Sequence, residues 1–282
     1  MIGMILRLLW RLFVGAIAIA LAYVTVFLFY PYLRNHFSIL ITFIVLYILT
    51  AYFGLPLLVR LWKLVIRPTH LPQYAVSRDG WSSDPVNIAI VCNDEAQLRQ
   101  AMEQAGWHIA DKPSFKNMLR EAWAIIFNQP YLTAPFSNLF LFGRKQDIGF
   151  QIQTGDPPTP RHRHHIRFWQ LQSEPEKPHH HIPFWENILQ IFFKGKKRQI
   201  WIGTATHDVS PFALRIQNLQ ITHKIDAETN KERDFVVDTL QKAGRVKRLE
   251  TIAAGEPILF RGQTLGVSIV TDGTLPVIEL KR

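Results

Sequence analysis

The hydrophobic pattern divides the chain into an apolar N-terminal part and a longer part of mixed character. Two uncharged, mostly apolar runs come first, at residues 12–30 and 37–59. Each is close to the length of about 20 apolar residues that crosses a bilayer as a helix. Polar residues between them, Arg34, Asn35 and His36, mark a turn. The pattern therefore predicts a two-helix transmembrane hairpin.

The two ends of this hairpin carry further signals. A cleaved signal peptide is the alternative for the first run, but the run exceeds a signal-peptide core and a second span follows at once. Beyond the second run, Arg60, Lys63 and Arg67 recur at helical spacing among apolar residues, as in a helix at the lipid headgroup layer. We predict a transmembrane hairpin with a basic interfacial segment over residues 1–70 and a linker over residues 71–85.

Residues 86–282 alternate between helical and strand-like patterns. Helices are predicted at 95–105, 115–127 and 229–243, begun by Asp94, by Ser114 and by a capping box from Thr229 to Glu232. Runs rich in β-branched and aromatic residues predict strands at 87–92, 139–142, 149–153, 165–171, 199–206, 220–226, 256–260, 264–270 and 276–280. Because helices and strands come in blocks, we predict an α+β domain with a largely antiparallel sheet and about three helices.

One connection in this domain has two interpretations. Residues 173–198 contain three consecutive histidines at 179–181 and a basic cluster at 194–198. Apolar residues at 184–193 interrupt this polarity. The segment is predicted either to dock on the bilayer as a short amphipathic helix or to cover a face of the sheet.

Charge is distributed unevenly along the chain. There are 32 Lys and Arg against 22 Asp and Glu, a net charge of +10. Residues 1–70 hold six of the basic residues and no acidic one, so residues 71–282 carry 26 − 22 = +4. The basic residues flank the outer ends of the two spans, which predicts a multi-pass membrane protein with two spans and both termini cytoplasmic. The mild excess elsewhere does not favour nucleic-acid binding.

The single cysteine, Cys92, excludes an intrachain disulfide. It ends an apolar run at residues 87–92 and has no evident activating partner in the sequence. Since a reactive thiol needs such a partner, Cys92 is predicted to be a small buried residue rather than a nucleophile.

Three runs combine histidine with charge, at residues 161–169, 201–208 and 221–226, and a charged segment follows at 228–234. Alternate residues of a strand share a face. This alternation predicts that one face of the sheet gathers His165, Arg167, His207 and His223. Asp208 and Asp226 are expected at strand ends, and Glu232 and Arg233 on the following helix. The candidate site residues are His165, Arg167, His207, Asp208, His223, Asp226, Glu232 and Arg233.

Such a set supports three kinds of chemistry. His and carboxylate ligands could bind Zn²⁺ or another divalent metal, with His165, His207, His223 and Asp226 as candidate ligands. His and Arg could instead hold a phosphate group. The third interpretation is a structural network that satisfies buried polar residues and ties the helix to the sheet. Motifs that would choose between them, such as HExxH, GxSxG, a P-loop or GxGxxG, do not occur.

Several longer motifs occur in order. They are YLTAPFS at 131–137, LFLFGRKQDIGFQ at 139–151, RHHIRFW at 163–169, IGTATHD at 202–208 and THKID at 222–226, with ERD at 232–234. Together they resemble the LssY C-terminal domain family over about residues 75–270. The resemblance implies a bacterial protein and places His165, Arg167, Asp208, His223, Asp226, Glu232 and Arg233 at the family's recurrent positions.

Members of that family are sometimes joined to membrane modules, including lipid-phosphatase-like ones. Phosphatase activity belongs to those modules and is not carried over, because this chain has too few spans for one. We therefore predict a membrane-anchored cytoplasmic binding or accessory module of the bacterial inner membrane. Its expected partners are the bilayer, an anionic lipid or phosphate-bearing ligand, and a membrane protein. The alternative is a membrane-anchored hydrolase of a phosphate- or lipid-linked substrate that uses the His, Asp and Arg residues.

Overall fold

The computed structural model describes residues 2–63, 74–171, 198–215, 219–254, 258–261 and 268–281. It divides into two compact units. The first consists of residues 1–69 with two short pieces, 79–81 and 214–221, and the second holds the rest of the chain.

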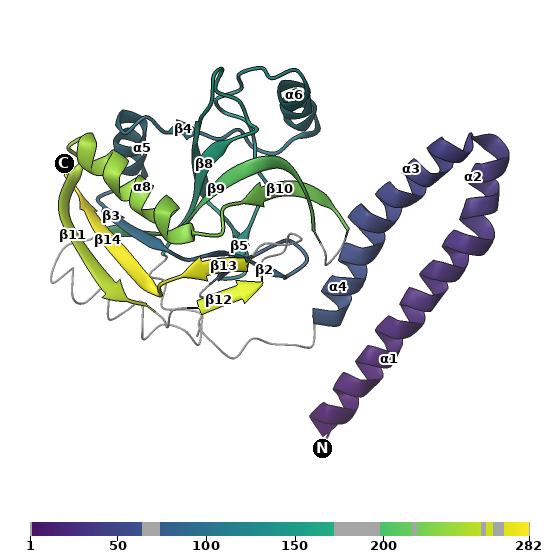
Figure 1. Ribbon diagram of the computed structural model, residues 1–282. Helices are drawn as coiled ribbons and strands as arrows, with labels where there is room; N and C mark the ends of the chain where they lie inside the picture. The colour runs from purple at the N-terminus through teal and green to yellow at the C-terminus, as the bar shows by residue number, and fades with distance from the viewer. Residues whose placement is uncertain are drawn as a thin grey trace. The chain divides into compact units, whose positions relative to one another are not determined.

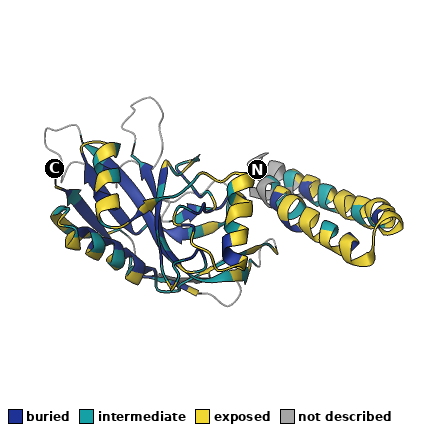
Figure 2. Cartoon of the chain, turned by 90° about the horizontal axis from the view of Figure 1, so that it is seen from above, coloured by how far each residue is buried: buried dark blue, intermediate teal, exposed yellow. Residues whose placement is uncertain are grey.

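The first unit is built on a helical hairpin (Figure 1). One arm comprises α1 (Ile2–Tyr23), a π-helical turn (Val24–Phe29) and α2 (Tyr30–His36), and the other comprises α3 (Ile39–Leu49), a second π-helical turn (Thr50–Gly54) and α4 (Leu55–Lys63). Two stretches, Leu12–His36 and Ile39–Leu58, are long and apolar enough to cross a membrane. Their large apolar side chains are mostly exposed (Figure 2).

The turn of the hairpin falls later than predicted. Arg34, Asn35 and His36 lie within α2, and the chain reverses at Phe37 and Ser38. The Ser38 side chain caps α3 by accepting a hydrogen bond from the backbone N–H of Ile41. The predicted pair of long apolar helices is confirmed, and only the position of the turn changes.

The second unit is an α+β domain around one large sheet (Figure 1). Its strands are β3 (Ile88–Cys92), β4 (His108–Ile109), β7 (Ile148–Gln153), β8 (Arg163–Gln170), β9 (Gln199–Leu214), β10 (Ile221–Ile225), β11 (Val246–Ala253) and β14 (Thr274–Leu280). The order is β11-β14-β3-β9-β8-β7-β4, and β10 pairs with β9. Along this order only the β14–β3 pair is parallel. The predicted α+β class and largely antiparallel sheet are confirmed.

Each face of the sheet has its own apolar core. Helices α5 (Glu95–Gln104) and α8 (Thr229–Lys242) pack on one face through residues such as Leu98, Met102 and Leu240. On the other face lies a smaller sheet, in which β2 (Ser82–Pro85), β1 (Tyr74–Val76), β5 (Phe140–Leu141) and β6 (Arg144–Lys145) follow in this order. Strand β3 is covered on both faces, which explains its unbroken apolar sequence. In Figure 2 the strands of this unit are mainly dark blue, whereas its helices carry yellow and teal.

Two further elements complete the described part of the domain. Helix α6 (Phe115–Ile126) begins at the predicted cap, where the Ser114 side chain accepts a hydrogen bond from the N–H of Asn117. Strands β12 (Ile258–Arg261) and β13 (Ser268–Thr271) form an antiparallel pair.

Several predictions of local structure are corrected. Residues 71–85 are predicted as a linker, but Tyr74–Val76 and Ser82–Pro85 within this range form β1 and β2 of the smaller sheet. The pattern misses β11, whose charged residues suit an exposed edge strand better than a buried one. The predicted capping box does not form, because Thr229 Oγ1 donates to the carbonyl of Val270 and Glu232 turns toward His164. The basic residue Arg67, the histidines at 179–181 and the apolar run 184–193 lie outside the described residues.

Candidate functional site

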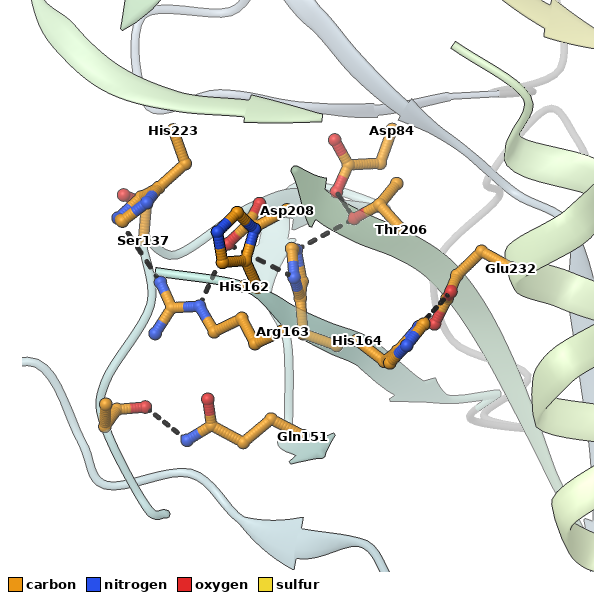
Figure 3. A network of polar contacts seen from close by, with 12 residues as sticks. Asp84, Ser137, Gln151, His162, Arg163, His164, Thr206, Asp208, His223 and Glu232 are labelled. Atoms are coloured by element: carbon orange, nitrogen blue, oxygen red, sulfur yellow. Dashed lines mark hydrogen bonds and ion pairs between the residues drawn. The ribbon is translucent and has the colours of Figure 1, made fainter. Parts of the chain in front are cut away.

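The register between β8 and β9 decides which charged residues meet. Arg163 lies opposite Asp208, His164 opposite His207, and His165 opposite Thr206. Opposite residues of paired strands point to the same face of the sheet. The polar residues of the two strands therefore form two separate groups, one toward the smaller sheet and one toward α8 (Figure 3).

This register corrects the predicted grouping. His165, Arg167 and Asp208 share the face toward the smaller sheet, but His207 lies on the opposite face beside His164. The alternation within each strand is as predicted. The relative register of two strands is a tertiary property, and a shift of one residue exchanges the faces. The strand also continues beyond Asp208 to Leu214, so Asp208 lies within β9 rather than at its end.

Arg163 is the centre of the first group. Its guanidinium is 1% exposed and binds two carboxylates, Asp208 at 2.9 Å (Nε to Oδ2) and Glu121 of α6 at 3.0 Å (Nη1 to Oε1). It also donates to the carbonyl of Pro135 at 3.1 Å, and its Nη2 lies 3.4 Å from Nε2 of His223. One buried cation thus connects two strands, a helix and a loop.

A second arginine continues this group along the same face. Arg167 Nη1 donates to Oδ2 of Asp84 in β2 at 2.9 Å, and its Nε donates to the carbonyl of Ser137. Thr206 Oγ1 lies 3.3 Å from the same Asp84 oxygen and 2.8 Å from Nε2 of His165. The group therefore joins the large sheet to the smaller one through paired opposite charges.

Burial and charge fix the protonation of these groups. Burial lowers the pKa of His165 well below its ordinary value, and it also lowers that of His223. Burial alone would raise the pKa of Asp208, but its neighbours His165, His223 and Arg163 outweigh it and lower the pKa. Both imidazoles are therefore neutral at pH 7 and Asp208 is ionised. Burial raises the pKa of Glu121.

The first group has the properties of a structural network. Arg163, His165, Arg167 and Asp208 are all at most 5% exposed, and the charged ones are paired with opposite charges. Only two members reach the surface, His223 with 25% of its side chain exposed and Glu121 with 14%. A substrate would have to displace existing ion pairs to reach Arg163 or Arg167. Of the three interpretations, this geometry supports the polar network for this face.

The second group lies on the opposite face, against α8. The rings of His164 and His207 stack 4.2 Å apart, and the ring of Phe235 stacks on His164 at 4.1 Å. His164 Nδ1 lies 2.6 Å from Oε2 of Glu232. One nitrogen from each histidine and one oxygen of Glu232 lie within 4.8 Å of one another. These three residues could hold a metal ion.

The remaining candidates take local structural roles. Asp226 accepts a hydrogen bond from the N–H of Glu228 at 3.0 Å, the turn role expected of an Asp before a helix. Arg233 pairs with Asp272 at 2.8 Å and with its neighbour Asp234, which ties α8 to the turn before β14. Cys92 is buried, and burial raises the pKa of its thiol to about 12.

Sequence reasoning missed several of the residues that the structure joins. Arg163 and His164 lie in the histidine-rich run at residues 161–169, but neither is among the predicted site residues. Asp84 and Glu121 come from distant segments, and nothing in their local sequence marks them as partners of Arg167 and Arg163. Only the folded chain brings these acids to the sheet.

The chain thus combines an α+β domain, which contains a buried charge network, with two helices apolar enough to span a membrane. A model of the family described as LssY C-terminus matches residues 68–275. The chain belongs to this family, as its motifs predict. No curated protein and no solved structure matches the chain.

Proposed function

We propose that this chain is a membrane-tethered binding module whose α+β domain works on the cytoplasmic surface of a bacterial inner membrane. The two apolar helices would hold the chain in the bilayer, and the basic residues at their outer ends favour a cytoplasmic location for both termini. The observation that carries the binding role is the exposed face of α6.

Helix α6 turns its apolar side outward. Phe115 is 79% exposed, Trp123 62% and Ile126 63%. At about 100° per residue these side chains, together with Met118 and Leu119, fall on one side of the helix. A contiguous exposed apolar surface on a folded domain marks an interaction site.

The charge on α6 selects an anionic bilayer as the partner. Lys116 and Arg120 are exposed and flank the apolar side. The only acid of the helix, Glu121, turns inward to Arg163 and so does not repel an anionic surface. Apolar residues beside basic ones are typical of a helix that lies in the interface of an anionic membrane.

The hydrolase alternative loses its predicted site. It required His165, His207 and His223 in one accessible pocket, but His207 lies on the other face and His165 is 3% exposed. We therefore expect no turnover by the full chain in a screen of phosphatase and esterase substrates. Hydrolysis that Asp208→Asn abolishes without unfolding the chain would restore the alternative.

An environment-sensitive fluorophore on α6 tests membrane docking. The full chain carries Cys92→Ala and one new cysteine, either at Leu119 or, as a matched control, at the exposed Glu103 of α5. Labelled protein is placed in lipid nanodiscs with and without anionic lipid. We expect a blue shift at position 119 that grows with anionic lipid and is reduced by Lys116→Glu with Arg120→Glu.

Two outcomes would contradict docking. One is an unchanged, water-like spectrum at position 119 in both lipids. The other is a blue shift that depends on protein concentration in detergent, which would indicate a second copy of the chain as the partner. Reporter fusions at residue 282 test the topology separately. A fusion whose reporter is active only outside the cytoplasm would refute the proposed orientation.

A further inference from the structure

The cluster of His164, His207 and Glu232 is separate from the network around Arg163. His164 comes from β8, His207 from β9 and Glu232 from the first turn of α8. All three lie on the helix-covered face of the sheet, and Phe235, which stacks on His164, also packs against the apolar core of that face. In Figure 3, Glu232 and His164 point toward each other and away from the group around Arg163.

The burial of the Glu232 carboxylate is not explained by packing alone. Its side chain is 3% exposed, and Oε1 is buried without a hydrogen-bond partner, while Oε2 contacts His164. The capping-box role that its sequence position offers is unused. A buried carboxylate oxygen without a partner is costly unless something positive completes its environment.

We propose that His164, His207 and Glu232 form a binding site for a divalent transition metal of the Zn²⁺ class. Two imidazoles and one carboxylate are the ligand set of catalytic zinc sites, which keep a fourth position open. The set carries one negative charge when both imidazoles are neutral, so a divalent cation would satisfy Glu232.

The ligand atoms lie near one another, and the two rings would reorient to share an ion. Zinc binds nitrogen and oxygen ligands at about 2.0–2.2 Å, so ligand atoms around a tetrahedral ion lie about 3.4 Å apart. The three ligand atoms already lie within 4.8 Å of one another. His207 is held by its backbone, whose carbonyl accepts a hydrogen bond from the N–H of Asp226 at 2.8 Å. The lone pair of each nitrogen lies in the plane of its own ring, so the two stacked rings would tilt out of their parallel arrangement, by rotation about side-chain bonds, for both nitrogens to face one ion.

The site is also reachable from solvent. His164 keeps 14% of its side chain exposed, and His207 is half-buried. An ion could therefore enter beside the two rings, with its open position toward solvent. The fourth ligand would be water or an anionic oxygen atom, the classes that such a position takes.

The test measures zinc in the full chain, purified in detergent without a histidine tag, stripped with a chelator and dialysed against Zn²⁺. Elemental analysis gives the stoichiometry and a competing chelator dye gives the affinity. We expect one equivalent in the wild type and a loss of affinity of about tenfold or more in Glu232→Gln and His207→Ala. His223→Gln, on the opposite face, is the matched control and should bind like the wild type.

The three histidines at 179–181 could also bind zinc, so a variant with all three replaced by alanine is included. We expect this triple-alanine variant to bind one equivalent of zinc, as the wild type does. Wild type without stoichiometric zinc would overturn the proposal, and so would loss of zinc from this variant while Glu232→Gln retains it. Bound Co²⁺ gives a second readout, because absorption bands of a tetrahedral ion should appear in the wild type and be absent in Glu232→Gln. Circular dichroism shows whether each variant is folded. If His207→Ala is unfolded, the zinc affinity of the near-isosteric Glu232→Gln variant tests the proposal.

Discussion

Replacing Arg163 by methionine tests whether the buried charge network holds the domain together. The change keeps most of the side-chain volume and removes the charge. It leaves Asp208 and Glu121 buried without the guanidinium that lies 2.9 Å and 3.0 Å from their oxygens. The domain should lose stability because two acids then lack their shared cation.

The magnitude follows from the burial of the pair. Two unit charges 2.9 Å apart attract by about 6 kcal/mol at an effective dielectric constant of about 20. Much of this attraction offsets the cost of removing both ions from water. What a variant measures is the cost of the charges left behind, about 3–5 kcal/mol for a buried pair. Glu121 can relieve part of its share by taking up a proton, since burial raises its pKa.

Guanidinium unfolding of the full chain in detergent measures this loss. Tryptophan fluorescence reports on the domain, because Trp107, Trp169 and Trp201 are fully buried in it. The midpoint should fall while the slope stays unchanged. The matched control is Arg99→Met, which removes the exposed partner of Glu95 and should cost at most about 1 kcal/mol.

A double-mutant cycle completes the test. Asp208→Asn combined with Arg163→Met should cost clearly less than the sum of the two single changes, because the second change removes a charge that the first left unpaired. The reasoning is refuted if Arg163→Met is as mild as Arg99→Met, or if the two changes at Arg163 and Asp208 are additive.

Three further predictions concern the core, pH and the thiol. Gly203→Ala should destabilise the domain by about 1–3 kcal/mol, because the new Cβ would lie 2.7 Å from side-chain atoms of both Ile88 and Phe168. An unfolding midpoint in guanidinium equal to that of the wild type would contradict this, since it would mean that the neighbouring side chains move aside without cost. Burial lowers the pKa of His223 in the folded state, so the unfolded chain takes up a proton first as pH falls below about 6.5. Stability should then fall by up to about 1.4 kcal/mol per pH unit until the folded pKa is reached, and His223→Gln should flatten this slope in thermal melts between pH 7 and 5; equal slopes would contradict it. Cys92 should resist alkylation at pH 7.5 until denaturant is added, because it is buried and its pKa is raised to about 12, and rapid labelling of the native chain would be inconsistent with this packing.

The sequence predicted those features of the site that depend on neighbours along the chain. Alternation in β8 correctly placed His165 and Arg167 on one face. It could not predict the partners of the two arginines. Asp84 precedes Arg167 by 83 residues and Glu121 precedes Arg163 by 42, so their ion pairs exist only after the smaller sheet and α6 have packed.

By itself, the sequence determined the elements whose physical cause is local. Long apolar runs make the two N-terminal helices, side-chain caps at Asp94 and Ser114 begin α5 and α6, and β-branched runs make the strands. Tertiary structure decided which polar residues meet. Strand register is set by the packing of whole faces, and here it separates His207 from His165 and pairs it with His164 beside Glu232. One set of histidines was therefore divided between a buried charge network and a proposed metal site, because alternation fixes faces within a strand and only the paired register fixes them between strands.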